Sequence, residues 1–283
     1  MVLTERAPAK INTCLYLGGT RADGRHELVS VMQSLEWGDE LRLELADADE
    51  LVCPGVEGPN LATAALQAVR EHAGWWETVR LTIDKRIPVA AGLGGGSADA
   101  AAALRLGAQR AGLPEARLFA LAARLGADVP AQVRPGRSLA TGAGEELEHL
   151  APPPRFGVLV LPSAETLSTA DVYRAADELE LSRPPAELAA RLDEVRAGLG
   201  TGPFGLATEL LVNDLEPAAR RLCPSIDGEL ETARRLGADH AMVSGSGPSV
   251  LGLFADPDAA RAAAAGLAGR RPAAVATVPL GAR

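Results

Sequence analysis

The stretch "PVAAGLGGGSADAAAALRLG", residues 88–107, places four glycines and Ser97 between a proline and a run of alanines. The alternating segment 79–83 predicts a strand before it, and the alanine-rich segment 97–112 predicts a helix after it. The first amides of a helix have no acceptor within the helix, so a glycine loop at this point can hold a phosphate. A plain turn in which Ser97 caps the helix uses the same residues, and both interpretations stay open.

Two well-known phosphate-binding loops do not fit this stretch. A P-loop requires a lysine directly after its glycines, and none follows here. A dinucleotide-binding fingerprint would use Ser97 as its third small residue, which is a marginal match, and the acidic strand end that should follow is missing. An NAD-binding domain is therefore disfavoured, and the loop belongs to another class.

The overall composition limits the possible ligands. The chain has 283 residues, enough for one large domain or two medium ones, and a formal net charge of −9. Nucleic acids and anionic membranes are bound by clusters of lysine and arginine, so an RNA-binding module or a membrane-surface protein is disfavoured. We expect any anionic ligand to be held locally, by backbone amides and a few cations.

The cysteines and the N-terminal segment indicate a cytoplasmic protein. Cys14, Cys53 and Cys223 lie far apart and form no C-x-x-C pair, which argues against a zinc site or a disulfide framework. Residues 1–19 have no apolar core typical of a signal peptide, and no segment reaches the roughly 18 apolar residues of a membrane span.

The pattern along the chain indicates two mixed α and β lobes. Alternation in 10–17 predicts a strand with Lys10 and Asn12 on one face, and the Asp-Gly pair in 21–28 predicts a turn. Further segments predict strands at 39–45 and 156–161 and helices at 60–74 and 115–126. Three prolines in 151–155 indicate a linker. We therefore expect an α+β protein with domains at 1–150 and 155–283.

Five motifs together resemble the GHMP kinases, a family that acts on galactose, homoserine, mevalonate and phosphomevalonate. They occur in the order of that family and span nearly the whole chain. They are "APAKINTCLYLGGTRADGRHEL" at 7–28, "PVAAGLGGGSADAA" at 88–101, "LGADVP" at 125–130, "NDLEPAA" at 213–219 and "SGSGPSVLGLF" at 244–254.

The resemblance implies a fold and a reaction. The fold would be two-lobed, with a ribosomal-protein-S5-like, ATP-binding N-terminal domain and a ferredoxin-like C-terminal domain. The pattern is most similar to members that use ATP and Mg²⁺ to phosphorylate the 2-hydroxyl of 4-diphosphocytidyl-2-C-methyl-D-erythritol, in the non-mevalonate isoprenoid pathway. Members that act on homoserine or mevalonate are the nearest alternatives. The substrate is a small molecule, and no nucleic acid, membrane or oligomeric state is implied.

The same resemblance assigns the chemistry to two residues. Asp128 would be the general base that takes the proton from the attacking hydroxyl. Lys10 would keep that carboxylate ionised and neutralise the transferring phosphoryl group. The residues alone favour simpler interpretations, in which Asp128 caps the helix that begins at Val129-Pro130 and Lys10 is a solvated side chain on a strand.

The remaining expected site residues bind the two substrates. For the acceptor, Asn12 would orient the molecule, His26 would read the cytosine edge, and Tyr173 with Thr169 would form a stacking platform. Arg25 stands where relatives often have an aromatic residue, and a guanidinium can also stack on a base. The residues expected to bind ATP are Asn60, Leu61, Lys85, Pro88, Gly92, Leu93, Gly94, Gly95, Gly96 and Ser97.

The Mg²⁺ ligands are not evident from the sequence. Ser97 and Asp128 are both possible ligands. Asp99 is instead expected to stabilise the first turn of the helix that follows the glycines.

Overall fold

The computed structural model describes residues 2–270 and 272–282, and the chain divides into two compact units. The first unit comprises Met1–Ala9, Trp37–Val89 and Gly94–Pro135. The second unit comprises Lys10–Glu36, Ala90–Leu93 and Gly136–Arg283. Residues 90–93 of the glycine stretch thus belong to the second unit, and its other residues belong to the first. The domain boundaries expected at 150 and 155 stay a prediction.

The strands of the first unit form a sheet that contains both antiparallel and parallel pairs. The strands are parts of β1 (Leu3–Thr20) and β2 (His26–Leu45), with β3 (Glu50–Val52) and β4 (Val79–Asp84). Strand β4 pairs antiparallel with β2, so that Leu41 lies opposite Ile83, and β3 pairs parallel with β4. The strands expected at 39–45 and 79–83 are confirmed, and alternation places Leu41, Leu43 and Leu81 on the buried face, while Leu45 at the end of its strand is exposed.

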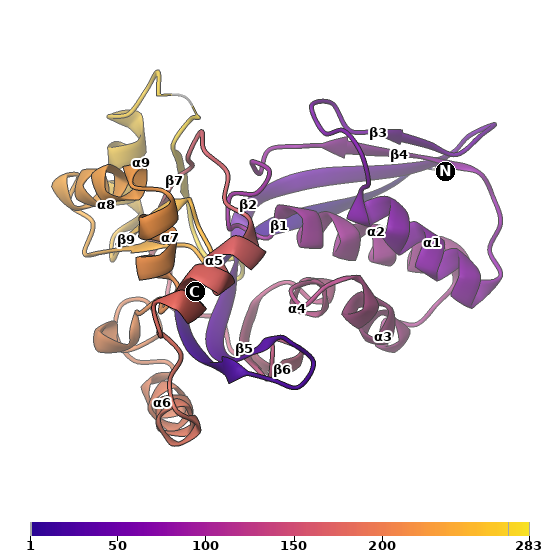
Figure 1. Ribbon diagram of the computed structural model, residues 1–283. Helices are drawn as coiled ribbons and strands as arrows, with labels where there is room; N and C mark the ends of the chain where they lie inside the picture. The colour runs from indigo at the N-terminus through magenta and orange to yellow at the C-terminus, as the bar shows by residue number, and fades with distance from the viewer. Residues whose placement is uncertain (1, 271, 283) are drawn as a thin grey trace. The chain divides into compact units, whose positions relative to one another are not determined.

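Helices α1 and α2 cover one face of this sheet (Figure 1). The helices of the first unit are α1 (Leu61–Ala73), α2 (Gly95–Ala111), α3 (Ala116–Leu125) and α4 (Val129–Val133). Helix α1 begins where Asn60 accepts a 2.8 Å bond from the Ala62 amide and ends at Gly74, whose φ is 64°. Residues 100–103 of α2 are alanines with no exposed surface, so neighbouring elements pack closely around them.

The second unit contains a hairpin and a separate four-stranded sheet. Its strands beyond β1 and β2 are β5 (Arg137–Thr141), β6 (Glu146–Leu150), β7 (Gly157–Leu161), β8 (His240–Val243), β9 (Val250–Phe254) and β10 (Val275–Thr277). Strand β5 pairs with β2 and β6, and the turn expected near Asp23-Gly24 separates β1 from β2. Residues 151–155 form no helix or strand.

The four-stranded sheet confirms the ferredoxin-like arrangement expected for the second lobe. Its antiparallel order is β10–β7–β9–β8. Two helices pack on it in the sequence β7–α8–β8–β9–α9–β10. The helices of this unit are α5 (Thr169–Glu178), α6 (Pro185–Gly198), α7 (Glu216–Leu222), α8 (Ser225–Arg235) and α9 (Pro257–Ala265), with a short 3₁₀ helix at Thr208–Leu210.

The structure describes the cysteines and the helix lengths, which concern the expectations about disulfides and membrane spans. Cys14, Cys53 and Cys223 are all free thiols. Across 2–270 and 272–282, every helix is too short or too polar to cross a bilayer.

Gly38 on β2 generates the first prediction. A Cβ on Gly38 would lie 2.4 Å from the Ala7 carbonyl oxygen and 2.5 Å from Pro8 Cα, which are rigid backbone atoms of β1. We expect Gly38→Ala to lower the free energy of unfolding by about 1–3 kcal/mol, measured by urea titration with circular dichroism. Gly19→Ala is the control, because a Cβ at that strand position meets no atom within 4 Å. Equal stability of the two variants would contradict the prediction.

Candidate functional site

Lys10 and Asn12 lie side by side on β1 and are buried, with 8% and 2% of their surface exposed. The expectation of a solvated strand lysine is therefore wrong. Lys10 Nζ donates to Asn12 Oδ1 at 2.9 Å, and Asn12 Nδ2 donates to Ser30 Oγ at 2.7 Å. Ser30 Oγ in turn donates to the Cys14 carbonyl at 2.6 Å. This chain of bonds fixes the direction of the Asn12 amide and holds the ammonium beside it.

Backbone contacts of the segment 90–93 bring Lys10 next to the turn at 244–247. The Lys10 amide donates to the Leu93 carbonyl at 3.0 Å, and Ser244 Oγ donates to the Gly92 carbonyl at 3.1 Å. Gly92 has a φ of 74°, and a Cβ there would lie 2.4 Å from the Ser244 carbonyl oxygen. Only glycine fits this position without displacing the turn.

Asn213 holds the turn at 244–247 in place. Its side-chain amide donates to the Val243 carbonyl at 3.0 Å and to the Gly245 carbonyl at 2.7 Å. An added Cβ on Gly245 would lie 3.1 Å from Asn12 Oδ1, so the turn closely approaches the Lys10–Asn12 pair. The sequence motifs at 213–219 and 244–254 thus meet through Asn213, a role that the motif spacing alone did not indicate.

His26 and Tyr173 lie together, although 147 residues separate them in the sequence. Their ring centroids are 5.1 Å apart at an interplanar angle of 42°. His26 is buried, and its Nε2 lies 2.6 Å from Asp177 Oδ1 and 3.3 Å from Thr20 Oγ1. Sequence reasoning missed Asp177, and its place four residues after Tyr173, on the same face of α5, was the available signal.

Thr169, at the start of α5, lies beside the turn at 244–247. Its Oγ1 is 3.1 Å from Ser246 Oγ, and either hydroxyl can donate. The structure therefore places Thr169 and Tyr173 on one helix, with Thr169 touching the glycine- and serine-rich turn and Tyr173 touching His26.

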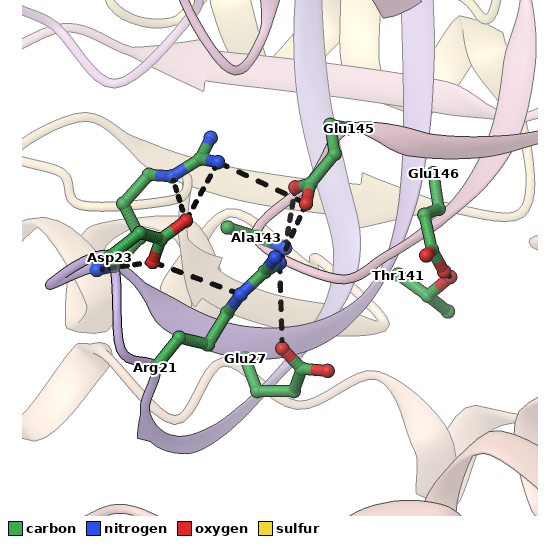
Figure 2. Close-up of polar contacts among 8 residues, drawn as sticks. Arg21, Asp23, Glu27, Thr141, Ala143, Glu145 and Glu146 are labelled. Atoms are coloured by element: carbon green, nitrogen blue, oxygen red, sulfur yellow. Dashed lines mark hydrogen bonds and ion pairs between the residues drawn. The ribbon is translucent and has the colours of Figure 1, made fainter.

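Arg25 lies in the exposed β1–β2 turn and binds Asp23 there. Its Nε and Nη2 donate to Asp23 Oδ2 at 3.1 and 3.0 Å, and Nη2 is 4.0 Å from Glu145 Oε1. Figure 2 shows how Arg21 and Glu145, at 2.6 Å, connect this turn to the β5–β6 turn. Glu145 also accepts from the Ala143 amide at 2.6 Å. A base that stacks on Arg25 would meet a guanidinium already paired with a carboxylate.

In the first unit, Lys85 is shared by two buried carboxylates. Lys85 Nζ donates to Asp39 Oδ2 at 2.5 Å and to Asp99 Oδ2 at 2.7 Å. Asp39 also accepts hydrogen bonds from the backbone amides of Arg86 and Ile87, and these bonds stabilise its negative charge in place of water. Burial, together with the charge of Asp39, outweighs the attraction of Lys85 and raises the pKa of the Asp99 carboxyl to about 7. This ion cluster was not expected from the sequence.

The N-terminus of α2 gathers several residues expected to bind ATP. Gly94, with a φ of 68°, is the residue before the helix and has no side chain to cap it. A Cβ on Gly95 would lie 3.0 Å from Lys85 Nζ, and one on Gly96 would lie 3.8 Å from Leu61 Cδ1. The first amides of α2 therefore depend on water or a ligand for acceptors.

One of the two open interpretations of the glycine stretch, in which Ser97 caps the helix, is wrong, and so is the role expected for Asp99. Ser97 is the third residue of α2 and does not occupy its capping position. Asp99 lies beyond the first turn and binds Lys85 instead of stabilising the helix start. Asn60 uses its side-chain oxygen to cap α1, and Pro88 is half-buried in the loop between β4 and α2.

Asp128 immediately precedes α4 but does not cap it. Its backbone is helical, and its half-buried carboxylate makes no capping bond to the first turn. The interpretation of Asp128 as a plain helix cap is therefore wrong. Among the residues that the structure describes, no three histidine, cysteine, aspartate or glutamate side chains cluster as they would around a resident metal ion.

Comparison with known proteins gives consistent matches over nearly the whole chain. The models of the GHMP kinases N terminal domain and of the GHMP kinases C terminal domain match residues 60–136 and 192–272. A 4-diphosphocytidyl-2-C-methyl-D-erythritol kinase of Heliobacterium modesticaldum is 38% identical over 92% of this chain and 89% of its own length.

Solved structures give the same result. A crystal structure of 4-(cytidine 5'-diphospho)-2C-methyl-D-erythritol kinase is 35% identical, with a TM-score of 0.78 over 98% of this chain and 99% of that one. A homoserine kinase from Cytophaga hutchinsonii has a TM-score of 0.71 over 98% of this chain and 93% of its own, but is 18% identical, so it shares the fold alone.

The raised pKa of Asp99 predicts how stability depends on pH. Between the ordinary aspartate value of 3.8 and about 7, the folded state holds a proton that the unfolded state has released. This carboxyl therefore makes the folded state progressively less stable as the pH rises through that window. We expect Asp99→Asn to remove this part of the slope, measured as urea-unfolding free energy across the window. Asp47→Asn, an exposed control, should keep the wild-type slope; an unchanged slope in Asp99→Asn would refute the assignment.

Proposed function

The chain belongs to the GHMP kinases, and on that premise we propose that it transfers the γ-phosphoryl group of ATP to the 2-hydroxyl of 4-diphosphocytidyl-2-C-methyl-D-erythritol. The two-lobed α+β fold expected from the resemblance, S5-like in its N-terminal part and ferredoxin-like in its C-terminal part, is confirmed. The observation that carries the substrate proposal is the contact of His26 with Tyr173, which supplies a polar edge and an aromatic face for a nucleobase.

In this proposal Asp128 accepts the proton of the attacking hydroxyl. Its carboxylate is half-buried and makes no capping bond, which supports a role in proton transfer. Lys10 neutralises charge that builds up on the transferring phosphoryl group, because a buried ammonium acts more strongly than a solvated one. Asn12, whose amide is fixed by Lys10 and Ser30, orients the acceptor. Positioning and charge neutralisation are the main requirements of phosphoryl transfer.

The ATP phosphates lie at the glycine stretch in this proposal. The uncapped amides at the start of α2 provide donors, and Gly92 and Gly94 adopt backbone conformations that other residues rarely adopt. Pro88, Leu93, Gly95, Gly96 and Ser97 would line the phosphate chain. Asn60, Leu61 and Lys85 would lie near the adenine, where Lys85 would act as a fixed part of the wall because two carboxylates already bind it.

Mg²⁺ fits this chain as an ion that enters with ATP. Magnesium usually takes one or two protein oxygen ligands and completes its shell with phosphates and water. The half-buried Ser97 hydroxyl and Asp128 carboxylate are oxygen ligands of this kind. When bound, the ion would reduce the repulsion between the phosphates and the incoming oxygen.

Several further points are part of the proposal. Thr169 and Tyr173 would contact the cytosine and its diphosphate, and Arg25 would cover the second face of the base.

The domain boundaries at 150 and 155 and the cytoplasmic location are proposed from the sequence. Homoserine or mevalonate as substrate would leave His26 and Tyr173 without a base to bind, and the relatives reported above favour the cytidyl compound.

Replacing the proposed base tests the mechanism. We expect Asp128→Asn to lower kcat by at least about 10²–10⁴-fold, because a carboxamide cannot accept the proton, while ATP binding measured by calorimetry stays within about twofold. Asp84→Asn, a change of the same chemistry at an exposed carboxylate of the first unit, should retain wild-type turnover. Full activity of Asp128→Asn would exclude Asp128 as the base.

A competition between substrates tests the assignment of the acceptor. In a coupled assay of ADP release, we expect turnover with 4-diphosphocytidyl-2-C-methyl-D-erythritol and background rates with mevalonate and homoserine. The physical reason is that only the first compound carries a base for His26 and Tyr173. Equal turnover of all three compounds, or none with the cytidyl compound, would overturn the assignment.

A further inference from the structure

Asp177 makes the most direct polar contact of the buried His26 ring. The 2.6 Å separation of His26 Nε2 from Asp177 Oδ1 is a hydrogen bond, and the histidine side chain is 7% exposed. An ionised carboxylate can only accept hydrogen bonds. Two acceptors this close would repel each other, so the proton of the ring must lie on Nε2. Thr20 Oγ1, at 3.3 Å from the same nitrogen, is too distant to compete with this bond.

The other ring nitrogen is then left as an acceptor. A neutral imidazole carries one proton, so a proton on Nε2 leaves a lone pair on Nδ1. Within the part of the chain that the structure describes, Nδ1 has no hydrogen-bond partner. It is also not one of the described side-chain atoms that are sealed from solvent without a partner. The lone pair is therefore not sealed from solvent.

Helix α5 positions Asp177 and Tyr173 together. The two residues are four apart, so they lie on the same face of the helix, one turn from each other. Tyr173 packs on the His26 ring while Asp177 holds its Nε2, and the ring is thus fixed in both position and rotation.

We propose that Asp177 is a positioning residue that holds His26 as the Nε2-protonated tautomer, so that Nδ1 accepts a hydrogen bond from the 4-amino group of cytosine. The proposal rests on the proposed function, in which His26 reads the base. Uracil carries a carbonyl oxygen where cytosine carries this amino group, and that oxygen would face the Nδ1 lone pair without a proton between them. Asp177 thereby determines the preference for cytosine over uracil without touching the base.

The tautomer can be measured in the absence of any substrate. Long-range ¹H–¹⁵N correlation spectra of the ¹⁵N-labelled full chain distinguish the two tautomers, at a pH at which the imidazole is neutral. The His26 signals are identified by their loss in His26→Gln. We expect the Nε2-protonated form in the wild type and a shift toward the Nδ1-protonated form in Asp177→Asn, because a carboxamide can donate to Nε2. An Nδ1-protonated wild type, or an unchanged tautomer in the variant, would overturn the proposal.

The consequence for recognition is measured separately. The ratio of CDP to UDP affinity, from calorimetry, should fall by about tenfold in Asp177→Asn. KM for the cytidyl substrate should rise by about the same factor, with kcat and the KM for ATP within about twofold. An unchanged CDP to UDP ratio would overturn the recognition role.

Glu178→Gln is the matched control for both measurements. Glu178 lies beside Asp177 at the same end of α5 and is similarly exposed, with 53% against 48% of the side chain, but it binds Arg221. Removal of its charge should leave the His26 tautomer and the nucleotide ratio unchanged. Absence of cytidyl phosphorylation in the wild type would refute the proposed function alone, because neither the spectra nor the nucleotide affinities require turnover.

Discussion

The close approach of the Gly92 backbone to the turn at 244–247 is the constraint on which the polar part of the second unit depends. The positions of the Ser244 and Gly247 carbonyl oxygens, 2.4 and 2.7 Å from where a Cβ would lie, leave no room for a side chain. This contact sets the path of the next residue, Leu93, whose carbonyl binds the Lys10 amide. The lysine is therefore positioned by backbone packing, and its ammonium donates to Asn12.

The two lysines of the proposed site are held by different electrostatic environments. Lys10 donates to the neutral side-chain amide of Asn12. Lys85 forms ion pairs with Asp39 and Asp99, and these two carboxylates neutralise its charge. Burying two carboxylates around one ammonium costs free energy, because both charges lose water, unless further hydrogen-bond donors replace that water. The backbone amides of Arg86 and Ile87 are such donors for Asp39. Among the residues that the structure describes, Asp99 Oδ1 is buried without a hydrogen-bond partner, and burial, together with the charge of Asp39, raises the pKa of this carboxyl.

Helices and strands could be predicted from the sequence more completely than the hydrogen bonds and ion pairs between polar side chains. Alternation and capping residues identified α1, β4 and the strand at 39–45, because these patterns depend on neighbours in the chain. The ferredoxin-like sheet followed from the resemblance, since its pairing of distant strands leaves no local signal. Lys85 binding to Asp39 and Asp99, and His26 binding to Asp177, could not be predicted, because each joins residues whose separation in the sequence carries no periodicity. The residues alone favoured a capping role for Asp128 and left one open for Ser97, because the same polar side chains that cap helices also bind ligands.

The division of the aromatic residues between the two units has a spectroscopic consequence. All three tryptophans, Trp37, Trp75 and Trp76, lie in the first unit, and both tyrosines, Tyr16 and Tyr173, lie in the second. Fluorescence excited selectively in tryptophan therefore reports on the first unit. The tyrosine contribution to near-ultraviolet absorbance, separated from the overlapping tryptophan contribution by derivative spectra, reports on the other unit, in which Tyr173 packs against His26. The natural chain thus carries a separate optical probe for each half, and the order in which the halves melt can be followed without any added label.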